Sequence, residues 1–250
     1  MNIAIVTGAS SGMGRELARL LARRQEVDKL ILVARREDRL RDLSIEISCH
    51  AEARLLALDL ADAGAASKLE CVLKEENAKV AWLVNAAGFG QIGRFDELTV
   101  EEQLSMLDVN CRALTAITHT VLPYMKKGGH IVNLASAAGF LPQPRFAVYA
   151  ATKSYVLSFS RALAEELRAK HIAVTAVCPG PVKTEFFDVA EKTGDIQIYK
   201  KIIMADCGRV SRGMIKAAAK GKTLYVPTLT MKAFRVLCKL PHCLLLRFVR

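Results

Sequence analysis

The chain has 250 residues, of which 52% are hydrophobic, 24% charged and 6% aromatic. This length suits one large α/β domain or two small ones, and the apolar fraction is enough to close a core without disulfides or metals. The composition excludes intrinsic disorder, collagen and disulfide-rich scaffolds. The seven cysteines contain no C-x-x-C pair, which favours reduced thiols and argues against zinc ligation. We therefore expect no bound metal.

The net charge of +11 is unevenly distributed along the chain. Residues 1–206 hold 26 basic and 25 acidic residues, whereas residues 207–250 hold ten basic residues and no carboxylate. This asymmetry argues against a nucleic-acid-binding body, and no stripe of interleaved aromatic and basic residues appears. We therefore expect no nucleic-acid partner.

The last segment, residues 229–250, combines apolar and basic side chains. Pro241 should divide it into two short helices or a helix and a loop. Its composition is compatible with packing on the domain, with an oligomer contact, or with weak peripheral contact with a membrane. The run Asn2–Thr7 has no basic n-region before it, and no stretch reads as a membrane span of ~20 apolar residues. We expect a soluble, cytoplasmic protein, with peripheral membrane association as one of the three alternatives for this segment.

Short apolar runs alternate with segments of helical period along the chain. Amphipathic stretches such as residues 16–21 and 157–167 predict helices. Apolar strands separated by helices are typical of a parallel sheet covered on both faces, with right-handed crossovers. The expected fold class is therefore α/β, a single doubly wound Rossmann domain over residues 1–250 with a seven-stranded parallel sheet. The expected strands are 2–7, 29–34, 53–58, 80–84, 129–135, 172–177 and 223–226.

A glycine-rich turn follows the first expected strand and opens the first helix. Glycines there permit backbone angles closed to other residues and let the main chain approach a pyrophosphate, whose charge the helix N-terminus stabilises. Its place at the start of the chain favours a dinucleotide site over a purely structural turn. The residues expected to bind the cofactor in this turn are Gly8, Ser10, Ser11, Gly12, Met13 and Gly14.

The second expected strand ends in Arg35 and Arg36. A free ribose 2′-hydroxyl favours Asp or Glu at this place, whereas a 2′-phosphate favours Arg. Glu37 and Asp38 come too late in the sequence to take the first role. Cations are unfavourable at a helix N-terminus unless an anion is near. The pair therefore predicts NADP(H) as the cofactor in preference to NAD(H).

Three side chains suggest acid–base chemistry. Ser136 ends the fifth expected strand, which delivers it to the ligand crevice of an open parallel sheet. Tyr149 and Lys153 have the spacing i, i+4, which on a helix puts phenol and ammonium on one face, about 5–6 Å apart at Cβ. Because an adjacent ammonium stabilises a phenolate, we expect Lys153 to lower the pKa of Tyr149 from ~10 toward neutrality, as general acid–base catalysis requires.

With these residues the chain resembles the short-chain dehydrogenase/reductase family, and its NADP(H)-preferring members in particular, over residues 2–184. The resemblance implies an enzyme that transfers a hydride from NADPH to a carbonyl, or from a secondary alcohol to NADP⁺. The strings that carry it are Thr7-Gly8-x-x-x-Gly12-x-Gly14, Asp59 after the third strand, Asn85-Ala86-Ala87-Gly88, Asn110, Ser136, Tyr149-x-x-x-Lys153 and Pro179-Gly180-x-x-x-Thr184.

The resemblance also implies the catalytic roles. Tyr149 would be the general acid in reduction and the base in oxidation, with Lys153 lowering its pKa and holding the nicotinamide ribose. Ser136 would hydrogen-bond the substrate carbonyl, and Asn110 would position a water that links Lys153 to solvent.

The same resemblance implies further cofactor contacts. Asp59 would hold the adenine, and Thr184 with the backbone near Val182 would bind the carboxamide. Ser11 stands where many NADP(H)-preferring relatives carry Lys or Arg, so discrimination would rest on Arg35, with Arg36 as a second contact. The implied contacts outside the glycine-rich turn and the arginines are Asp59, Leu60, Asn85, Ala86, Ala87, Gly88, Tyr149, Lys153, Pro179, Gly180, Val182 and Thr184.

Residues 184–206 are apolar for a loop, which predicts either a water-excluding lid over a lipophilic cleft or a helical flap that packs on the core. The expected substrate is a lipophilic carbonyl or alcohol of steroid or acyl type. The alternatives are a 3-oxoacyl thioester reductase of lipid synthesis and an NADPH-binding sensor without turnover. By the resemblance, a homodimer or homotetramer is expected. The residues expected to contact the substrate are Ala138, Phe140, Phe146 and Phe186.

Overall fold

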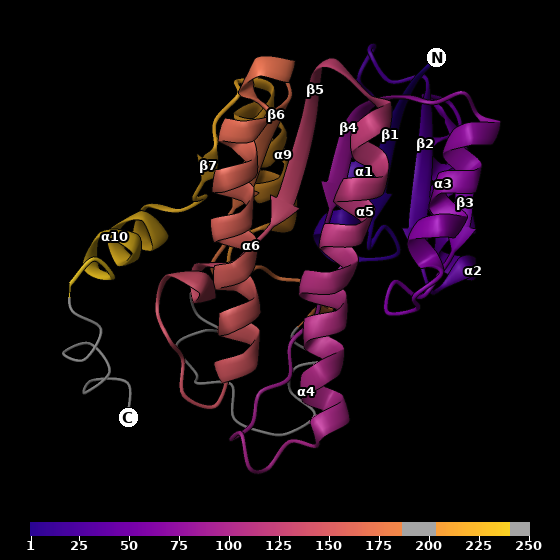
Figure 1. The fold of residues 1–250 in the computed structure, drawn as a ribbon. Helices are drawn as coiled ribbons and strands as arrows, with labels where there is room; N and C mark the ends of the chain where they lie inside the picture. Colours follow the sequence, from indigo (N-terminus) through magenta and orange to yellow (C-terminus); the bar gives the residue numbers. More distant parts are fainter. Residues whose placement is uncertain (187–203, 241–250) are drawn as a thin grey trace.

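The strands of the protein form one parallel sheet in the order β3-β2-β1-β4-β5-β6-β7, seen in a computed structural model that describes residues 1–186 and 204–240 (Figure 1). Every pairing between neighbouring strands is parallel. This confirms the expected seven-stranded, doubly wound sheet. The strands are β1 Asn2–Thr7, β2 Lys29–Ala34, β3 Glu52–Ala57, β4 Lys79–Asn85, β5 Met125–Leu134, β6 Ala173–Val177 and β7 Leu224–Tyr225.

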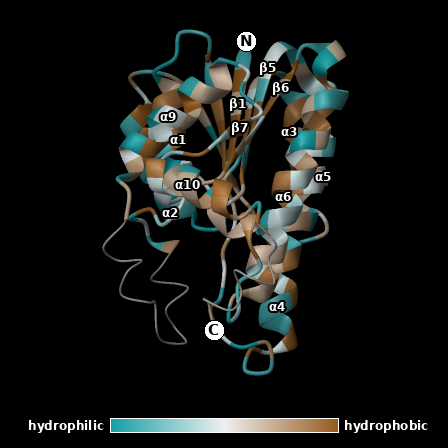
Figure 2. Ribbon diagram, turned by 90° about the vertical axis from the view of Figure 1, so that its left-hand side faces the viewer, coloured by the Kyte–Doolittle hydropathy of each residue, from teal (hydrophilic) through white to brown (hydrophobic). Residues whose placement is uncertain are grey.

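Helices cover both faces of this sheet, as Figure 2 shows from the side. One face carries α1 Gly12–Ala22, α2 Glu37–Ile47 and α9 Cys207–Ala219. The other carries α3 Ala65–Glu75, α5 Leu114–Val121 and α6 Ala147–Glu166, with α4 Val100–Leu107 leading into α5.

The apolar run of β1 shows why both faces are covered. Successive side chains of a strand point to opposite faces. Ile3 and Ile5 pack in the cluster beneath α3, α5 and α6, whereas Ala4 and Val6 pack in the cluster beneath α1, α2 and α9. All four are fully buried. A strand buried on both sides has no polar alternation, which is why the sequence predicted a parallel sheet.

The strand order reverses between β1 and β4. The chain moves outward from β1 to β3, returns to β4 on the other side of β1, and then continues to β7. In open parallel sheets such a reversal leaves a crevice at the carboxyl ends of the strands, where ligands bind. The first turns of α6 lie at this end of the sheet (Figure 1).

A chain of buried side-chain hydrogen bonds fixes α6 against the sheet. The side-chain amide of Asn85 in β4 donates to Thr118 Oγ1 at 3.0 Å and to Asn133 Oδ1 at 2.8 Å. Asn133 in β5 donates in turn to Ser160 Oγ of α6 at 2.9 Å. A hydrogen bond between buried groups is costly to leave unmade. These bonds therefore link β4 and β5 to the long helix, which packs against β5 and β6, and hold it at one register.

The last described helix, α10 Leu229–Leu237, lies to one side of the sheet (Figure 1). Its inner side packs Met231 against Gly180, where an added Cβ would lie 2.7 Å from the methionine sulfur. Its outer side leaves Leu229 81% and Val236 65% exposed. Pro241 lies outside the described residues. No helix in residues 1–186 and 204–240 has the length and apolarity that a membrane span requires.

Candidate active site

The turn between β1 and α1 is built from close backbone contacts. Gly8 and Gly12 have φ of +68° and +52°, in the left-handed region that favours glycine. A Cβ on Gly14 would lie 2.2 Å from the carbonyl oxygen of Gly8, and one on Gly8 would lie 2.7 Å from the amide nitrogen of Ala87. Larger residues at these positions would push the turn away from its neighbours.

The N-terminus of α1 has the features of an anion site. Ser11 occupies the N-cap position but its side chain accepts no hydrogen bond from the helix, and the first turn of α1 contains no acidic residue. The first N–H groups of this helix are therefore not satisfied by a side chain, and the helix dipole favours a negative charge there. The turn therefore fits a pyrophosphate, as the sequence predicted.

The expected cofactor floor follows β4 and is tied to β1. Thr7 Oγ1 accepts hydrogen bonds from the amide nitrogens of Ala86 at 3.1 Å and Ala87 at 3.2 Å. A Cβ on Gly88 would lie 2.8 Å from Asn110 Oδ1 and 3.2 Å from Lys153 Nζ. The floor therefore runs from the glycine-rich turn to the expected catalytic residues.

Asn110 lies in a π-helical turn, Asp108–Ala113, between α4 and α5. Its side chain is buried and bridges two elements, because Oδ1 accepts from the amide of Phe89 at 3.1 Å while Nδ2 donates to the Phe89 carbonyl at 2.9 Å and to Thr152 Oγ1 at 3.1 Å. π-helical turns inside helices are frequent at functional sites. These bonds join the floor to α6. The water relay implied for Asn110 stays a prediction.

The structure brings Ser136, Tyr149 and Lys153 together. Tyr149 and Lys153 lie in the first two turns of α6 and are 6% and 5% exposed. Lys153 Nζ lies 5.6 Å from the centre of the Tyr149 ring and donates to the carbonyl of Leu134 at 2.8 Å. Ser136 caps a 3₁₀ turn, Ala137–Phe140, by accepting from the amide of Ala138. The predicted group therefore lies at the carboxyl end of β5, with Tyr149 and Lys153 buried and Ser136 half-buried.

Burial moves the two ionisable groups in opposite directions. It raises the pKa of Tyr149 to about 12, an effect that a hydrogen bond with the Ser136 side chain opposes. It lowers the pKa of Lys153 to about 8. The prediction that Lys153 lowers the pKa of Tyr149 toward neutrality is therefore wrong for this arrangement. Desolvation disfavours the charged form of both groups, and the lysine nitrogen donates to a backbone carbonyl rather than to the phenol.

Apolar side chains surround the Tyr149 ring. Phe146 stacks on it with ring centres 4.2 Å apart, and Phe186 lies at 5.6 Å with a tilt of 50°. Ala138 and Met106 belong to the same buried cluster. Of the residues expected to contact the substrate, Phe140 is the exception, since it packs in a separate cluster behind the 3₁₀ turn. Met106 was not expected, because one residue in a helix as short as α4 gives no distinct periodic signal.

At the other end of the glycine-rich turn, the two expected arginines have different partners. Arg35 is 3.7 Å from Asp59 and its side chain is 74% exposed. Arg36 donates to Ser10 Oγ at 3.3 Å and to Glu185 Oε2 at 3.0 Å. Arg36, rather than Arg35, is therefore the arginine in contact with the turn. Glu185 was not expected there, because 149 residues separate it from Arg36 in the chain.

The segment after β6 connects both ends of the site. The Pro179 carbonyl accepts from the amide of Ala137, beside Ser136. Val182 forms a parallel bridge with Ala205, and Thr184 lies 3.3 Å from a Cβ built on Gly12. Most of the predicted lid, residues 187–203, lies outside the described residues. Two other residues that were expected to contact the cofactor have contacts elsewhere. Leu60 packs in the core cluster beneath α3, and Gly180 contacts α10.

A doubly wound sheet with a glycine-rich anion site and a Ser–Tyr–Lys group at the carboxyl end of its strands defines a nucleotide-dependent oxidoreductase. The family model of the short chain dehydrogenases matches residues 2–194, and the chain belongs to this family. It is accordingly a nicotinamide-dependent oxidoreductase that interconverts alcohols and carbonyls.

Three similar proteins illustrate the range of this family. The chain is 36% identical over 209 residues to sulfoacetaldehyde reductase 2 of Chromohalobacter salexigens, which covers 82% of this chain and 81% of the relative. It superposes with a TM-score of 0.84 on a short-chain dehydrogenase from Sphingobium yanoikuyae in complex with NADPH, at 28% identity over 100% of this chain and 97% of that one. A bulky-bulky ketone specific alcohol dehydrogenase from Comamonas testosteroni gives a TM-score of 0.79 at 25% identity, covering 98% and 94% of the two chains.

The burial of Lys153 predicts a pH dependence of stability. Its pKa is about 8 in the folded protein against 10.5 for an ordinary lysine. Between these values the unfolded chain binds the extra proton, so the cost of burying this lysine falls and the free energy of unfolding rises as the pH goes from 8 toward 10.5. We expect Lys153→Met to lose this rise, about 1 kcal/mol per pH unit, in urea unfolding between pH 8 and 9.5.

Lys68→Met, at an exposed position on α3, is the matched control and should unfold with the pH dependence of the unchanged protein. Burial raises the pKa of the Cys178 thiol to about 12, which gives an opposite slope in all three proteins and cancels in the comparison. An unchanged slope in Lys153→Met would show that the lysine is not buried as described.

Proposed function

We propose that the protein is an NADPH-dependent reductase of lipophilic ketones of steroid or acyl type, which also oxidises the corresponding secondary alcohols. The observation that carries this proposal is the position of the Tyr149 hydroxyl group. It belongs to a buried ring that lies between Phe146 and Phe186, with Ser136 and Lys153 beside it.

The protonation state of Tyr149 favours the reductive direction. A phenol with a pKa of about 12 keeps its proton at neutral pH, as a general acid must before it protonates a carbonyl oxygen. The bound nicotinamide supplies the hydride. The Ser136 hydroxyl donates a hydrogen bond to the same oxygen, and Lys153, held by the Leu134 carbonyl, supports Tyr149 from the side of the floor. In the oxidative direction, burial opposes formation of the phenolate base.

Three observations support NADP(H) as the cofactor. The end of β2 and the start of α2 present the cations Arg35, Arg36 and Arg39, of which Arg36 contacts the glycine-rich turn. The first turn of α1, where the anion site lies, contains no acidic residue. The Sphingobium neighbour was determined with NADPH.

The apolar surroundings of Tyr149 support a lipophilic substrate. Phe146, Phe186, Met106 and the buried Ile92 present no charged group to the ring. The Comamonas neighbour is named for bulky ketones, whereas the Chromohalobacter relative is named for a small polar aldehyde. The 3-oxoacyl thioester reductase remains the second candidate, because an acyl chain would find the same apolar side chains.

We expect the protein to reduce ketones with NADPH, and the rate to depend on Tyr149. Oxidation of NADPH is measured across ketones graded by size and polarity, including an acyl thioester, and large apolar ketones are expected as substrates. With the preferred ketone, Tyr149→Phe keeps the ring and removes the acid, so we expect kcat to fall ~10²–10⁴-fold with NADPH binding retained.

Tyr155→Phe is a matched control on the same helix. Tyr155 lies on the outer side of α6, where its hydroxyl bonds Thr115 at 2.8 Å, so its loss should leave turnover unchanged. Turnover of small polar aldehydes or sugars alone would contradict the lipophilic assignment. Full activity in Tyr149→Phe would refute the mechanism, and NADPH binding without turnover of any ketone would favour a sensor.

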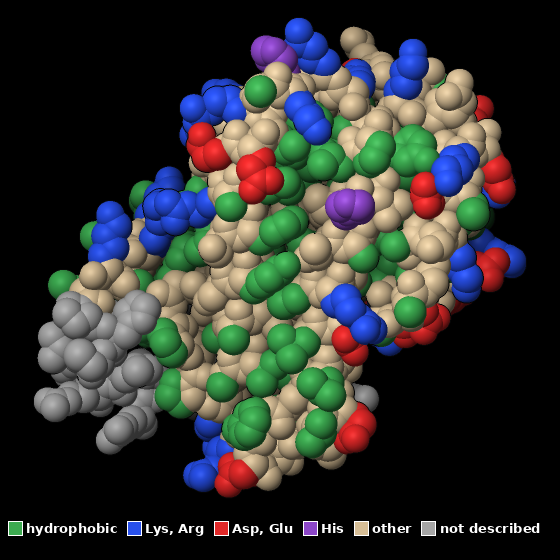
Figure 3. All heavy atoms as spheres, in the orientation of Figure 1, with side chains coloured by type: hydrophobic (Ala, Val, Ile, Leu, Met, Phe, Trp, Pro, Cys, Tyr) green, Lys and Arg blue, Asp and Glu red, His purple; other side chains and the backbone are tan. Residues whose placement is uncertain are grey.

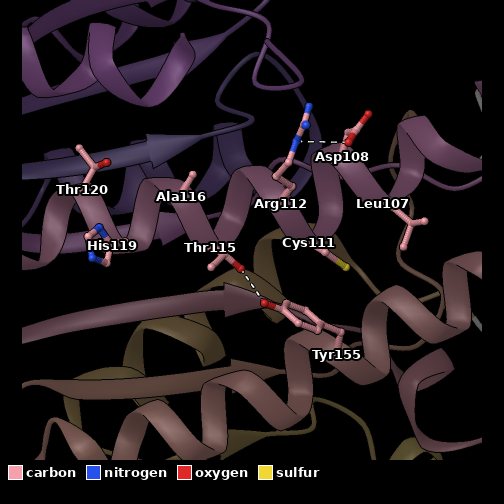
Figure 4. Close-up of a pocket in the computed structure, with 9 residues that line it drawn as sticks. All are labelled: Leu107, Asp108, Cys111, Arg112, Thr115, Ala116, His119, Thr120 and Tyr155. Carbon is pink, nitrogen blue, oxygen red and sulfur yellow. Dashed lines mark hydrogen bonds and ion pairs between the residues drawn. The ribbon is translucent and has the colours of Figure 1, made fainter. Parts of the chain in front are cut away.

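The outer side of α5 and α6 supports the expected oligomer. Hydrophobic side chains gather along the middle of this face in Figure 3. Figure 4 shows the residues that line a groove on this face, with Tyr155 of α6 bonded to Thr115 of α5 and the Arg112–Asp108 pair on the side of its helix away from Tyr155. We infer that a second copy of the chain covers this face. The groove is lined by Leu107, Asp108, Cys111, Arg112, Thr115, Ala116, His119, Thr120 and Tyr155.

A bulky charge in this groove should separate the copies. We expect sedimentation velocity of the unchanged protein to show a dimer or tetramer, and Ala116→Arg to shift it to a smaller species. Ile45→Arg, at a position 73% exposed on α2, is the control and should leave the size unchanged. A monomer of the unchanged protein at micromolar concentration would contradict the proposal.

Peripheral membrane contact, one of the three alternatives for residues 229–250, is supported by the outer side of α10. There Leu229 and Val236 are exposed beside the basic Lys232 and Lys239, which suits an interface with anionic lipid. We expect the double variant Leu229→Gln/Val236→Gln, which spares the inner side of the helix, to lose co-sedimentation with anionic vesicles. Equal amounts bound before and after the change, or no binding by the unchanged protein, would dismiss this contact.

A further inference from the structure

Glu185 places a carboxylate between two arginines at the edge of the glycine-rich turn. Its Oε2 accepts from both terminal nitrogens of Arg36, at 3.0 and 3.1 Å, and its Oε1 lies 3.7 Å from Arg39. The same Arg36 donates to Ser10 Oγ at 3.3 Å. The two arginines come from the start of α2, whereas the carboxylate comes from the segment after β6.

The neighbours of Glu185 hold it at this place. Thr184 lies against Gly12, 3.3 Å from a Cβ built there, and Phe186 lies 5.6 Å from the Tyr149 ring. Residue 185 is therefore fixed between the anion site at α1 and the apolar side chains around the tyrosine. Because its neighbours are held on both sides, the Glu185 side chain contacts Arg36 and Arg39 from a fixed backbone position.

The arrangement has the chemistry of a phosphate site that is filled by a carboxylate. Guanidinium groups bind carboxylates and phosphates with the same paired N–H geometry, and a phosphate monoester carries more charge than a carboxylate. The end of β2 is also where a doubly wound fold places the arginine for a cofactor 2′-phosphate. Arg36 and Arg39 cannot keep all their contacts with Glu185 and also bind such a phosphate.

We propose that Glu185 is a specificity-determining residue, because its carboxylate competes with the cofactor 2′-phosphate for Arg36 and Arg39. The proposal rests on the proposed function, since it assumes that NADPH binds at this turn. NADPH must displace the carboxylate from the arginines. NADH has no 2′-phosphate and leaves the ion pairs in place. Glu185 therefore lowers the affinity for NADPH and has no effect on that for NADH.

The expected effect is moderate. The side chains of Arg36, Arg39 and Glu185 are all between 43% and 44% exposed, and ion pairs with such access to solvent are individually weak. Removing the competing charge should tighten NADPH binding about 3- to 10-fold, and this gain should shrink at high salt because screening weakens the ion pairs.

The experiment measures the dissociation constants of NADPH and NADH on the full chain by titration of cofactor fluorescence. Glu185→Gln keeps the size of the side chain and removes its charge. Glu37→Gln is the matched control, because Glu37 lies on the same helix as Arg39 but pairs with Arg41 at 2.7 Å. We expect only Glu185→Gln to tighten NADPH, with NADH unchanged in both variants.

A double-mutant cycle separates competition from a general change of charge. In the Arg36→Ala background, the substitution Glu185→Gln should give a smaller gain than in the unchanged protein, since one of the two arginines in dispute is gone. A gain of equal size in both backgrounds, equal tightening of NADPH and NADH, or the same gain in Glu37→Gln would overturn the proposal.

Failure of this inference and failure of the proposed function have different signatures. If the unchanged protein binds NADPH and Glu185→Gln leaves that affinity unchanged or weaker, only the role of Glu185 is refuted. If the unchanged protein binds neither NADPH nor NADH, both are refuted.

Discussion

The burial of Lys153 beside Tyr149 is the constraint on which the site depends. A lysine that is 5% exposed needs a polar partner, and here the Leu134 carbonyl at the end of β5 accepts its hydrogen bond. This bond fixes the first turns of α6 against the carboxyl end of the sheet. The bonds from Asn85 through Asn133 to Ser160 fix the same helix further along, so the position of Tyr149 is determined by the core.

This burial also decides the chemistry of the phenol. Desolvation raises the pKa of Tyr149 to about 12, opposed by the hydrogen bond with the Ser136 side chain, and burial lowers the pKa of Lys153 to about 8. A tyrosine in this condition holds its proton at neutral pH. In the proposed function, this protonated phenol is the acid that serves the reductive direction. Spacing along a helix brings two groups together but does not determine which form the surroundings favour.

The part of the site at the end of β2, where the cofactor 2′-phosphate is proposed to bind, is organised by charge rather than by burial. Its arginines are partly exposed and already engaged, Arg35 by Asp59 and Arg36 by Glu185. A phosphate that binds there must compete with carboxylates that already pair with these arginines. Cofactor preference in this protein is therefore a balance between anions, in which a residue of the segment after β6 takes part.

The sequence by itself determined the parallel α/β fold, the glycine-rich turn and the grouping of Ser136 with Tyr149 and Lys153. These follow from local rules: apolar strands are continuous, glycine marks backbone that approaches other backbone, and residues four apart share a helix face. Only the tertiary structure decided that Arg36 rather than Arg35 contacts the turn, that Phe140 packs in a different cluster from Tyr149, and that Glu185 reaches Arg36. These contacts join segments far apart in the chain, and the direction of a pKa shift depends on burial, which no spacing encodes.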